Sequence, residues 1–184
     1  MRRRSILLLG TALLCVGLVA LDERAETRPP TLVGRLLGPV RGLAATIQWV
    51  RFNEERTHGR FDLAYERAES ALEFDPQSPA GWMVFAHHLA FDRGAPGMAP
   101  DDAARLAWFE AGLSVLDRGR EQTTFPRDLW FMRGTFLTAQ AEYGEDCVWP
   151  GGPREALLEA ARAFEAAGDS ELARNLRAKA AEQE

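Results

Sequence analysis

Cysteine is scarce in this chain of 184 residues, which contains only Cys15 and Cys147. Cys15 lies within an apolar run at the N-terminus, so a single thiol remains in the rest of the chain. One thiol cannot close an internal disulfide. No internal disulfide is therefore expected to stabilise the fold. Cys147 is either a buried apolar side chain or a partner in intermolecular pairing.

An excess of positive charge is also absent. Lysine and arginine total 22 against 27 aspartates and glutamates, which gives a net charge of -5. After the first four residues the basic side chains are interspersed with acidic ones and form no basic patch along the sequence. Because binding to a phosphate backbone depends on clustered positive charge, nucleic acid is not expected as a partner.

Motifs for catalysis or metal binding are missing as well. The chain has three histidines, and the adjacent His87 and His88 would point about 100° apart on a helix, whereas helical zinc ligands recur at four-residue steps. It has no glycine-rich phosphate loop and no G-x-S-x-G nucleophile motif. The acidic pair Asp101 and Asp102 suits a helix N-terminus. We expect no enzymatic activity, no metal site and no cofactor.

The N-terminus, in contrast, carries a clear targeting pattern. Three arginines are followed by an uncharged apolar run over residues 5–21. This run has the composition of a single-pass transmembrane anchor or a signal peptide, and the small-residue cleavage site is poor because Leu18 stands at its first position. We predict an anchor over 1–21, with a cleaved signal as the alternative. The positive-inside rule places the rest of the chain on the periplasmic or other extracytoplasmic side.

Pro29, Pro30 and later glycines predict a non-helical linker over 22–40, so the folded domain is expected to span 41–184. Its first predicted helix covers 41–57, with Leu43, Ile47 and Val50 marking one face, Trp49 as a further candidate for that face, and Gly59 ending the helix. His58 is expected to satisfy carbonyls at this helix end.

Two further helices follow at short intervals. The segment 61–74 places Ala64, Ala68, Ala71 and Leu72 on one stripe, and Ser78 caps a helix that starts at Pro79. The buried face of this third helix is expected to consist of Trp82, Phe85, Ala86 and Leu89. A turn this short predicts antiparallel packing.

The remaining sequence predicts four more helices separated by two inserted loops. The loops are 93–100 and 143–153, both rich in glycine and proline. The helices are expected over 101–116, with Ala104, Trp108 and Ala111 as the packing stripe, over 126–141, from Pro153, and from about Asp169. The total is about seven helices: three pairs and a terminal helix that can cap the stack.

The stretch from Gly59 to Leu89 resembles the tetratricopeptide repeat. Gly59, Phe61, Ala64, Ala71, Leu72 and Pro76 match the second half of one repeat, and Trp82, Ala86 and Leu89 match the first half of the next. Trp130, Gly134 and Leu137 repeat the latter spacing. The resemblance implies an all-α right-handed solenoid of antiparallel helix pairs. The two tryptophans are 48 residues apart instead of 34, and we assign the excess to the loop 93–100.

A tetratricopeptide-like solenoid implies a concave groove lined by the first helix of each pair. Carried over by position, the groove side chains are Trp49, Asn53, Arg56, Met83, His87, Phe91, Phe131 and Thr135. The alternative is that the large members of this set belong to the core. Some family members grip a C-terminal carboxylate with lysine and asparagine, but Trp49 stands at the lysine position here, so this specificity is not inferred.

The combination predicts a membrane-anchored, exported scaffold or adaptor that binds a protein or peptide in an envelope-associated complex. Large apolar side chains of the groove would bury partner surface, and Asn53, Arg56 and His87 would fix its orientation. The alternative function is a self-associating structural protein of the cell envelope whose groove is filled from within.

Overall fold

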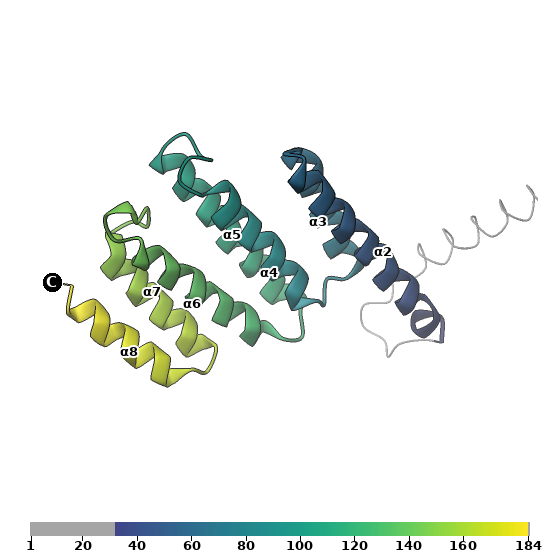
Figure 1. The fold of residues 1–184 in the computed structure, drawn as a ribbon. Helices are drawn as coiled ribbons and strands as arrows, with labels where there is room; N and C mark the ends of the chain where they lie inside the picture. The colour runs from purple at the N-terminus through teal and green to yellow at the C-terminus, as the bar shows by residue number, and fades with distance from the viewer. Residues whose placement is uncertain (1–31, 184) are drawn as a thin grey trace, which may run out of the picture.

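The computed structural model describes residues 32–183, with side chains from Val40 onward. Within that range it contains seven α-helices, one π-helical and one 3-10 segment, and no β-strand. Successive helices turn back on one another, and the pairs follow in chain order across the molecule (Figure 1). α2 packs on α3, α4 on α5, and α6 on α7, while α8 covers α7 at the end of the row. The predicted all-α fold is confirmed at this level.

The first described helix, α2 (Leu32–Thr57), differs from its prediction in two ways. It begins at Leu32, so residues 32–40 of the linker predicted over 22–40 are helical and Pro39 lies inside the helix. Proline removes one backbone donor, and the helix continues past that loss. The buried face also differs, because Ala45 and Phe52 pack inward while Leu43, Ile47 and Val50 are exposed.

The end of α2 and the whole of α3 (Phe61–Phe74) agree with the predicted pattern. Gly59 adopts a left-handed φ of 70° after the last turn of α2, and the His58 ring lies 2.7 Å from the Glu54 carbonyl oxygen. All four members of the predicted α3 stripe are buried, namely Ala64, Ala68, Ala71 and Leu72. Their small size allows α3 to approach its neighbours closely.

The turn into α4 (Pro79–His87) is capped as expected, since Ser78 Oγ accepts from the Gly81 amide at 3.4 Å. The same turn is tied to the one between α5 and α6. Gln77 donates to the Gln122 carbonyl at 2.6 Å, and the Thr123 hydroxyl donates to the Gln77 carbonyl at 3.0 Å. These bonds fix the second helix pair against the start of the third.

α4 continues without a break into η1 (His88–Arg93), a π-helical segment closed by a 3.1 Å bond from the Gly94 amide to the Leu89 carbonyl. Such wider turns are uncommon and concentrate at functional sites. The predicted loop follows, and then α5 (Asp102–Gln122), capped by Asp101 Oδ1 on the Ala104 amide at 2.8 Å. The spacing of Trp82 and Trp130 exceeds the 34-residue repeat by 14 residues. These extra residues therefore lie in the helices as well as in the loop 93–100.

The packing face of α5 was predicted in part. Ala104, Trp108 and Ala111 are half-buried, and Trp108 and Ala111 pack against the core, but the adjacent face is the fully buried one. That face combines Phe109, Leu113 and Leu116 with the two helix glycines Gly112 and Gly119. Helix periodicity judged by apolar side chains overlooks glycines, because they contribute contact without a side chain of their own.

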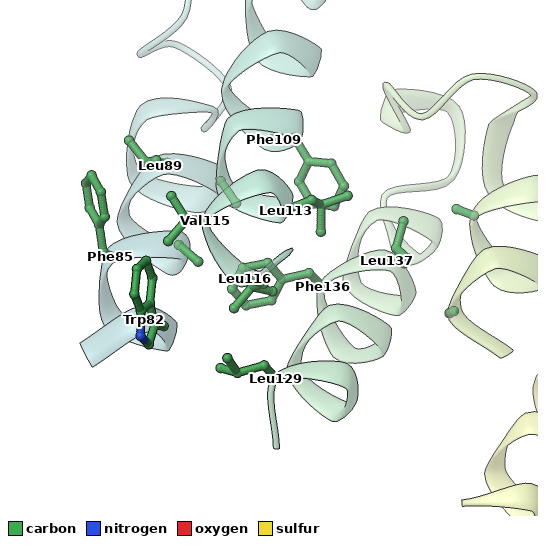
Figure 2. Close-up of a cluster of buried hydrophobic side chains, with 14 of the residues drawn as sticks. Trp82, Phe85, Leu89, Phe109, Leu113, Val115, Leu116, Leu129, Phe136 and Leu137 are labelled. Atoms are coloured by element: carbon green, nitrogen blue, oxygen red, sulfur yellow. The ribbon is translucent and has the colours of Figure 1, made fainter. Parts of the chain in front are cut away.

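One continuous core joins the helix pairs. Trp82, Phe85 and Leu89 of α4 and η1 meet Phe109, Leu113, Val115 and Leu116 of α5, and α6 (Pro126–Glu142) adds Leu129, Phe136 and Leu137 (Figure 2). The predicted face of the third helix is thus confirmed. Trp130 is half-buried, with the Arg120 guanidinium 3.5 Å from its ring centroid.

The C-terminal part follows the predicted order. After η2 (Gly144–Asp146), Pro153 lies in the first turn of α7 (Gly152–Ala166), which buries Ala156, Ala160 and Ala163. Asp169 caps α8 (Ser170–Ala181), whose inner face contains Ala173, Leu176 and Ala180. Arg105, a buried residue that is 7% exposed, joins α5 to η2 by donating to the Asp146 carbonyl at 3.1 Å.

No helix within residues 32–183 is both long and apolar enough to span a bilayer. The predicted anchor over residues 1–21 lies outside the described residues.

Candidate binding cavity between α2, α4 and α6

A cavity of about 280 Å³ lies between the first helices of the three pairs. Its walls come from α2, from α4 with the start of η1, and from α6. The lining residues are Phe52, Asn53, Arg56, Met83, Val84, His87, His88 and Met132. Four of these side chains, Asn53, Arg56, Val84 and His87, are exposed, so the cavity opens to solvent on their side.

The floor and the rim of the cavity differ in chemistry. Phe52 is 1% exposed, and the half-buried thioethers of Met83 and Met132 adjoin it. Methionine is flexible and polarisable, which lets such a surface adapt to ligands of different shape. The rim carries the amide of Asn53 and the guanidinium of Arg56. The cavity therefore presents an apolar interior bordered by a few hydrogen-bonding groups, the usual composition of a binding site.

A charged network closes the cavity where α2 meets η1. Asp92 Oδ2 lies 2.8 Å from Arg56 Nη1 and also 2.8 Å from His88 Nδ1. His88 is 1% exposed, and its Nε2 atom has no hydrogen-bond partner. The wider turn of η1 carries both His88 and Asp92, so this irregular segment positions the network beside the cavity.

Aromatic rings surround the buried imidazole. Phe52 meets it edge-on with ring centroids 5.3 Å apart, and Phe61 and Tyr65 each lie at 5.9 Å. The Arg93 guanidinium stacks on the Phe61 ring, 4.3 Å from its centroid. His88 is thus enclosed by apolar rings, one carboxylate and two cationic side chains.

These surroundings change the acidity of both members of the pair. Burial lowers the pKa of His88 below its ordinary value of 6.5, and the charges of Arg56 and Arg93 act in the same direction, against the hydrogen bond to Asp92. Burial alone would raise the pKa of Asp92, but its hydrogen bonds with His88 and Arg56 hold that pKa below the ordinary value. The folded protein therefore favours a neutral His88 beside an ionised Asp92.

This arrangement predicts a loss of stability in weak acid. Because the unfolded chain protonates His88 at a higher pH than the folded protein does, the free energy of unfolding should fall as the pH drops below 6.5. Asp92 contributes stability that is present above its ordinary pKa of 3.8 and is lost only at still lower pH. Urea unfolding of the full chain in mild detergent, measured from about pH 8 to about pH 5, reports the contribution of His88 to stability, because the contribution of Asp92 is lost only at lower pH.

The variant His88→Phe keeps an aromatic ring among Phe52, Phe61 and Tyr65 but cannot titrate. Its urea midpoint should change less over the same pH range than that of the unmodified chain. If the urea midpoint of the unmodified chain did not change with pH, or if it changed equally in both proteins, the pH dependence could not be assigned to His88.

The structure gathers four of the predicted groove side chains in the cavity: Asn53, Arg56, Met83 and His87. The others lie elsewhere. Trp49 is half-buried and meets Phe52 edge-on at 5.4 Å, while the half-buried Phe91 packs against the core with its ring centroid 4.8 Å from that of Phe136. Phe131, 45% exposed, contacts Phe164 of α7, and Thr135 is exposed with its hydroxyl bound to the Phe131 carbonyl.

Sequence reasoning did not identify Phe52, Val84, His88 or Met132 as cavity residues. Met132 follows directly after the predicted Phe131, so the register of α6 relative to α4 was displaced by one residue. Met132 is also the second methionine at the cavity, and a search for pairs of methionines on first helices would have found it. No sequence signal indicated the π-helical turn that brings His88 and Asp92 together.

Other reactive groups do not join this site. Within residues 32–183 no three histidine, cysteine or acidic side chains come together as a metal site. Cys147 is half-buried beside the core, and burial raises the pKa of its thiol. A raised pKa reduces the thiolate fraction at neutral pH.

Comparison of the chain with protein-family models, with curated proteins and with solved structures gives no match.

Proposed function

We propose that the chain is a membrane-anchored, extracytoplasmic adaptor whose tetratricopeptide-like helical domain binds a segment of another protein in the cavity between α2, α4 and α6. The observation that carries this proposal is the cavity itself: an apolar floor with two methionines, and a rim of amide, guanidinium and imidazole groups. Its position on the first helices of successive pairs is the one that the tetratricopeptide resemblance implies for a partner. The role is binding and not catalysis.

The cavity favours a partner segment that inserts one large apolar side chain. Phe52, Met83 and Met132 provide apolar contact, and fully burying such a side chain contributes about 1.5–3 kcal/mol. Arg56 is already paired with Asp92, so the rim adds no strong uncompensated positive charge. Asn53 and His87 can instead bind the backbone of the inserted segment and set its direction.

Val84→Asp tests this directly. Val84 lines the cavity and is 47% exposed, so a carboxylate there changes the site without entering the core. The matched control is Leu63→Asp, because Leu63 is 40% exposed on α3 and does not line the cavity. Both variants should keep the helical circular dichroism of the unmodified chain.

Proteins that co-purify with the full chain in mild detergent are identified by quantitative mass spectrometry for the three forms. We expect a partner that is retained by the Leu63→Asp chain and lost from the Val84→Asp chain. Titration with that purified partner should then give a Kd at least about tenfold weaker for Val84→Asp, a difference of about 1.4 kcal/mol. Equal binding by all three forms would place the binding surface outside the cavity.

A further inference from the structure

The outward side of α2 carries an apolar line that no part of the described structure covers. Val40, Leu43, Ile47 and Val50 have 60%, 61%, 45% and 63% of their surfaces exposed. We call these four residues the outer seam of α2. The opposite side of the same helix buries Ala45 and Phe52. One helix thus has two apolar faces, and only one of them is packed.

The spacing within the outer seam is that of a coiled coil. Its members follow one another at intervals of three, four and three residues, the alternation of the a and d positions of a heptad. In the sequence the same register continues back to Leu36 and Val33, both within the bounds of α2. A helix that merely covers its own domain has no need for this alternation on its outward side.

The residue types at the two positions indicate what pairs with the seam. Position a is occupied by Val33, Val40 and Ile47, all β-branched, and position d by Leu36, Leu43 and Val50. β-branched side chains at a with leucine at d favour a parallel pair of helices. Because a parallel pair of this kind is formed readily by identical sequences, the pattern points to a second copy of the same chain.

The flanking positions are compatible with such a pair. In the helical register Ala44 and Arg51 fall at e, and Thr46 and Asn53 at g. Thr46 would face Arg51 of the second chain, so no like charges oppose each other across the seam. The next a position is Glu54, where two carboxylates would repel, and the seam therefore ends at Val50, before the turn into α3.

We propose that the protein forms a parallel homodimer in which the outer seam of α2 pairs with the same seam of a second copy. The two chains would run in the same direction, and their N-terminal segments would emerge from the same end of the pair. Of the α2 residues that line the binding cavity, Phe52 and Arg56 fall at positions f and c, away from the seam, while Asn53 at position g lies at its edge, so the cavity adjoins the paired helices. This proposal is independent of the proposed function.

Cysteine cross-linking of the full chain in mild detergent tests the pairing. In a Cys15→Ser, Cys147→Ser background, Leu43→Cys and Val50→Cys each place a thiol at a d position, and Gly42→Cys places one on the adjacent exposed residue at position c. Mild oxidation should link the first two into dimers and leave the third unlinked. An antiparallel pair would link at most one of the two d positions. That result, the absence of dimers from both, or equal linking at Gly42 would overturn the proposal.

The mass of the full chain in detergent, corrected for bound detergent, gives a second test. The unmodified chain should have twice the mass of one copy, and Leu43→Glu with Ile47→Glu should halve it while retaining the helical signal, because both sites are exposed. Leu63→Glu is the control that keeps the dimer. A monomeric unmodified chain would overturn the proposal.

The proposed partner binding and the proposed homodimer can be refuted independently of each other. Val84→Asp should lose the partner and remain dimeric, whereas the doubly substituted seam variant should become monomeric and keep an intact cavity.

Discussion

Replacing Phe109 by alanine is expected to lower the free energy of unfolding by about 3–5 kcal/mol. The Phe109 side chain is 0% exposed and lies where three parts of the molecule meet. Its ring centroid is 6.0 Å from that of Phe91 in η1 and 5.9 Å from that of Trp149 in the loop before α7. Removing the ring leaves a cavity that the rigid helices around it cannot close.

The control for this variant is Phe125→Ala, which removes the same ring from a site that is 61% exposed. Its effect should stay within about 0.5 kcal/mol, as for most surface substitutions. Urea unfolding of the full chain in mild detergent, followed by circular dichroism, measures both. Similar losses in the two variants would show that Phe109 is not part of a tightly packed centre.

Substitution of Gly112 by alanine is expected to destabilise the protein by about 1–3 kcal/mol, although alanine is the better helix former. A Cβ atom at Gly112 would lie 2.7 Å from the Ala86 carbonyl oxygen and 2.9 Å from Ala90 Cβ. These atoms belong to the neighbouring helix, and a backbone oxygen cannot rotate away. α5 must therefore move away from α4 and η1.

The matched control is Gly42→Ala on α2, where a Cβ atom would meet nothing within 4 Å. There the helix preference acts alone and should stabilise the protein by up to about 1 kcal/mol. The two glycine-to-alanine changes should thus have opposite signs in the same urea experiment. A stabilising effect at Gly112 would mean that α4 and α5 lie farther apart than the distances at Gly112 require.

The Gly112 contact also bears on the binding site. α4 carries Met83, Val84 and His87, so displacement of α4 would alter the cavity wall. A variant at Gly112 is therefore expected to weaken partner binding as well as stability. The close packing of α4 on α5 is one of the conditions that hold the cavity in shape.

Much of the fold could be predicted because local signals agreed with one another. α3 has the predicted bounds, since Gly59 and Asp75-Pro76 mark both of its ends. Its stripe of alanines is buried as expected. The start of α4 followed from Ser78 and Pro79, and the start of α7 from Pro153. In these places capping residues, prolines and helix periodicity all indicated the same boundary.

The errors have identifiable physical causes. α2 has apolar residues on two sides, and periodicity alone does not show which side faces the core. The packed face of α5 depends on Gly112 and Gly119, whose contribution is close approach and not hydrophobicity. No local sequence signal marks the π-helical turn of η1, so the buried pairing of His88 with Asp92 could not be predicted.

The candidate site was predicted only in part, because its residues were placed by register alone. Register carried over from the tetratricopeptide pattern placed Asn53, Arg56, Met83 and His87 on one surface, and the structure brings them together. In α6 the register is displaced by one residue, so Met132 takes the place expected for Phe131. A pattern of large side chains cannot resolve such a displacement, because both neighbours are large and apolar.

Site-specific photo-cross-linking can detect a partner protein inside the cavity. A photoreactive phenylalanine analogue is introduced at Val84, inside the cavity, and in a parallel chain at Leu63, on the outer face of α3. After irradiation of cells that make the full chain, we expect a covalent product with a second protein from position 84 and none with that protein from position 63. The same product from both positions, or none from position 84, would contradict a binding role for the cavity.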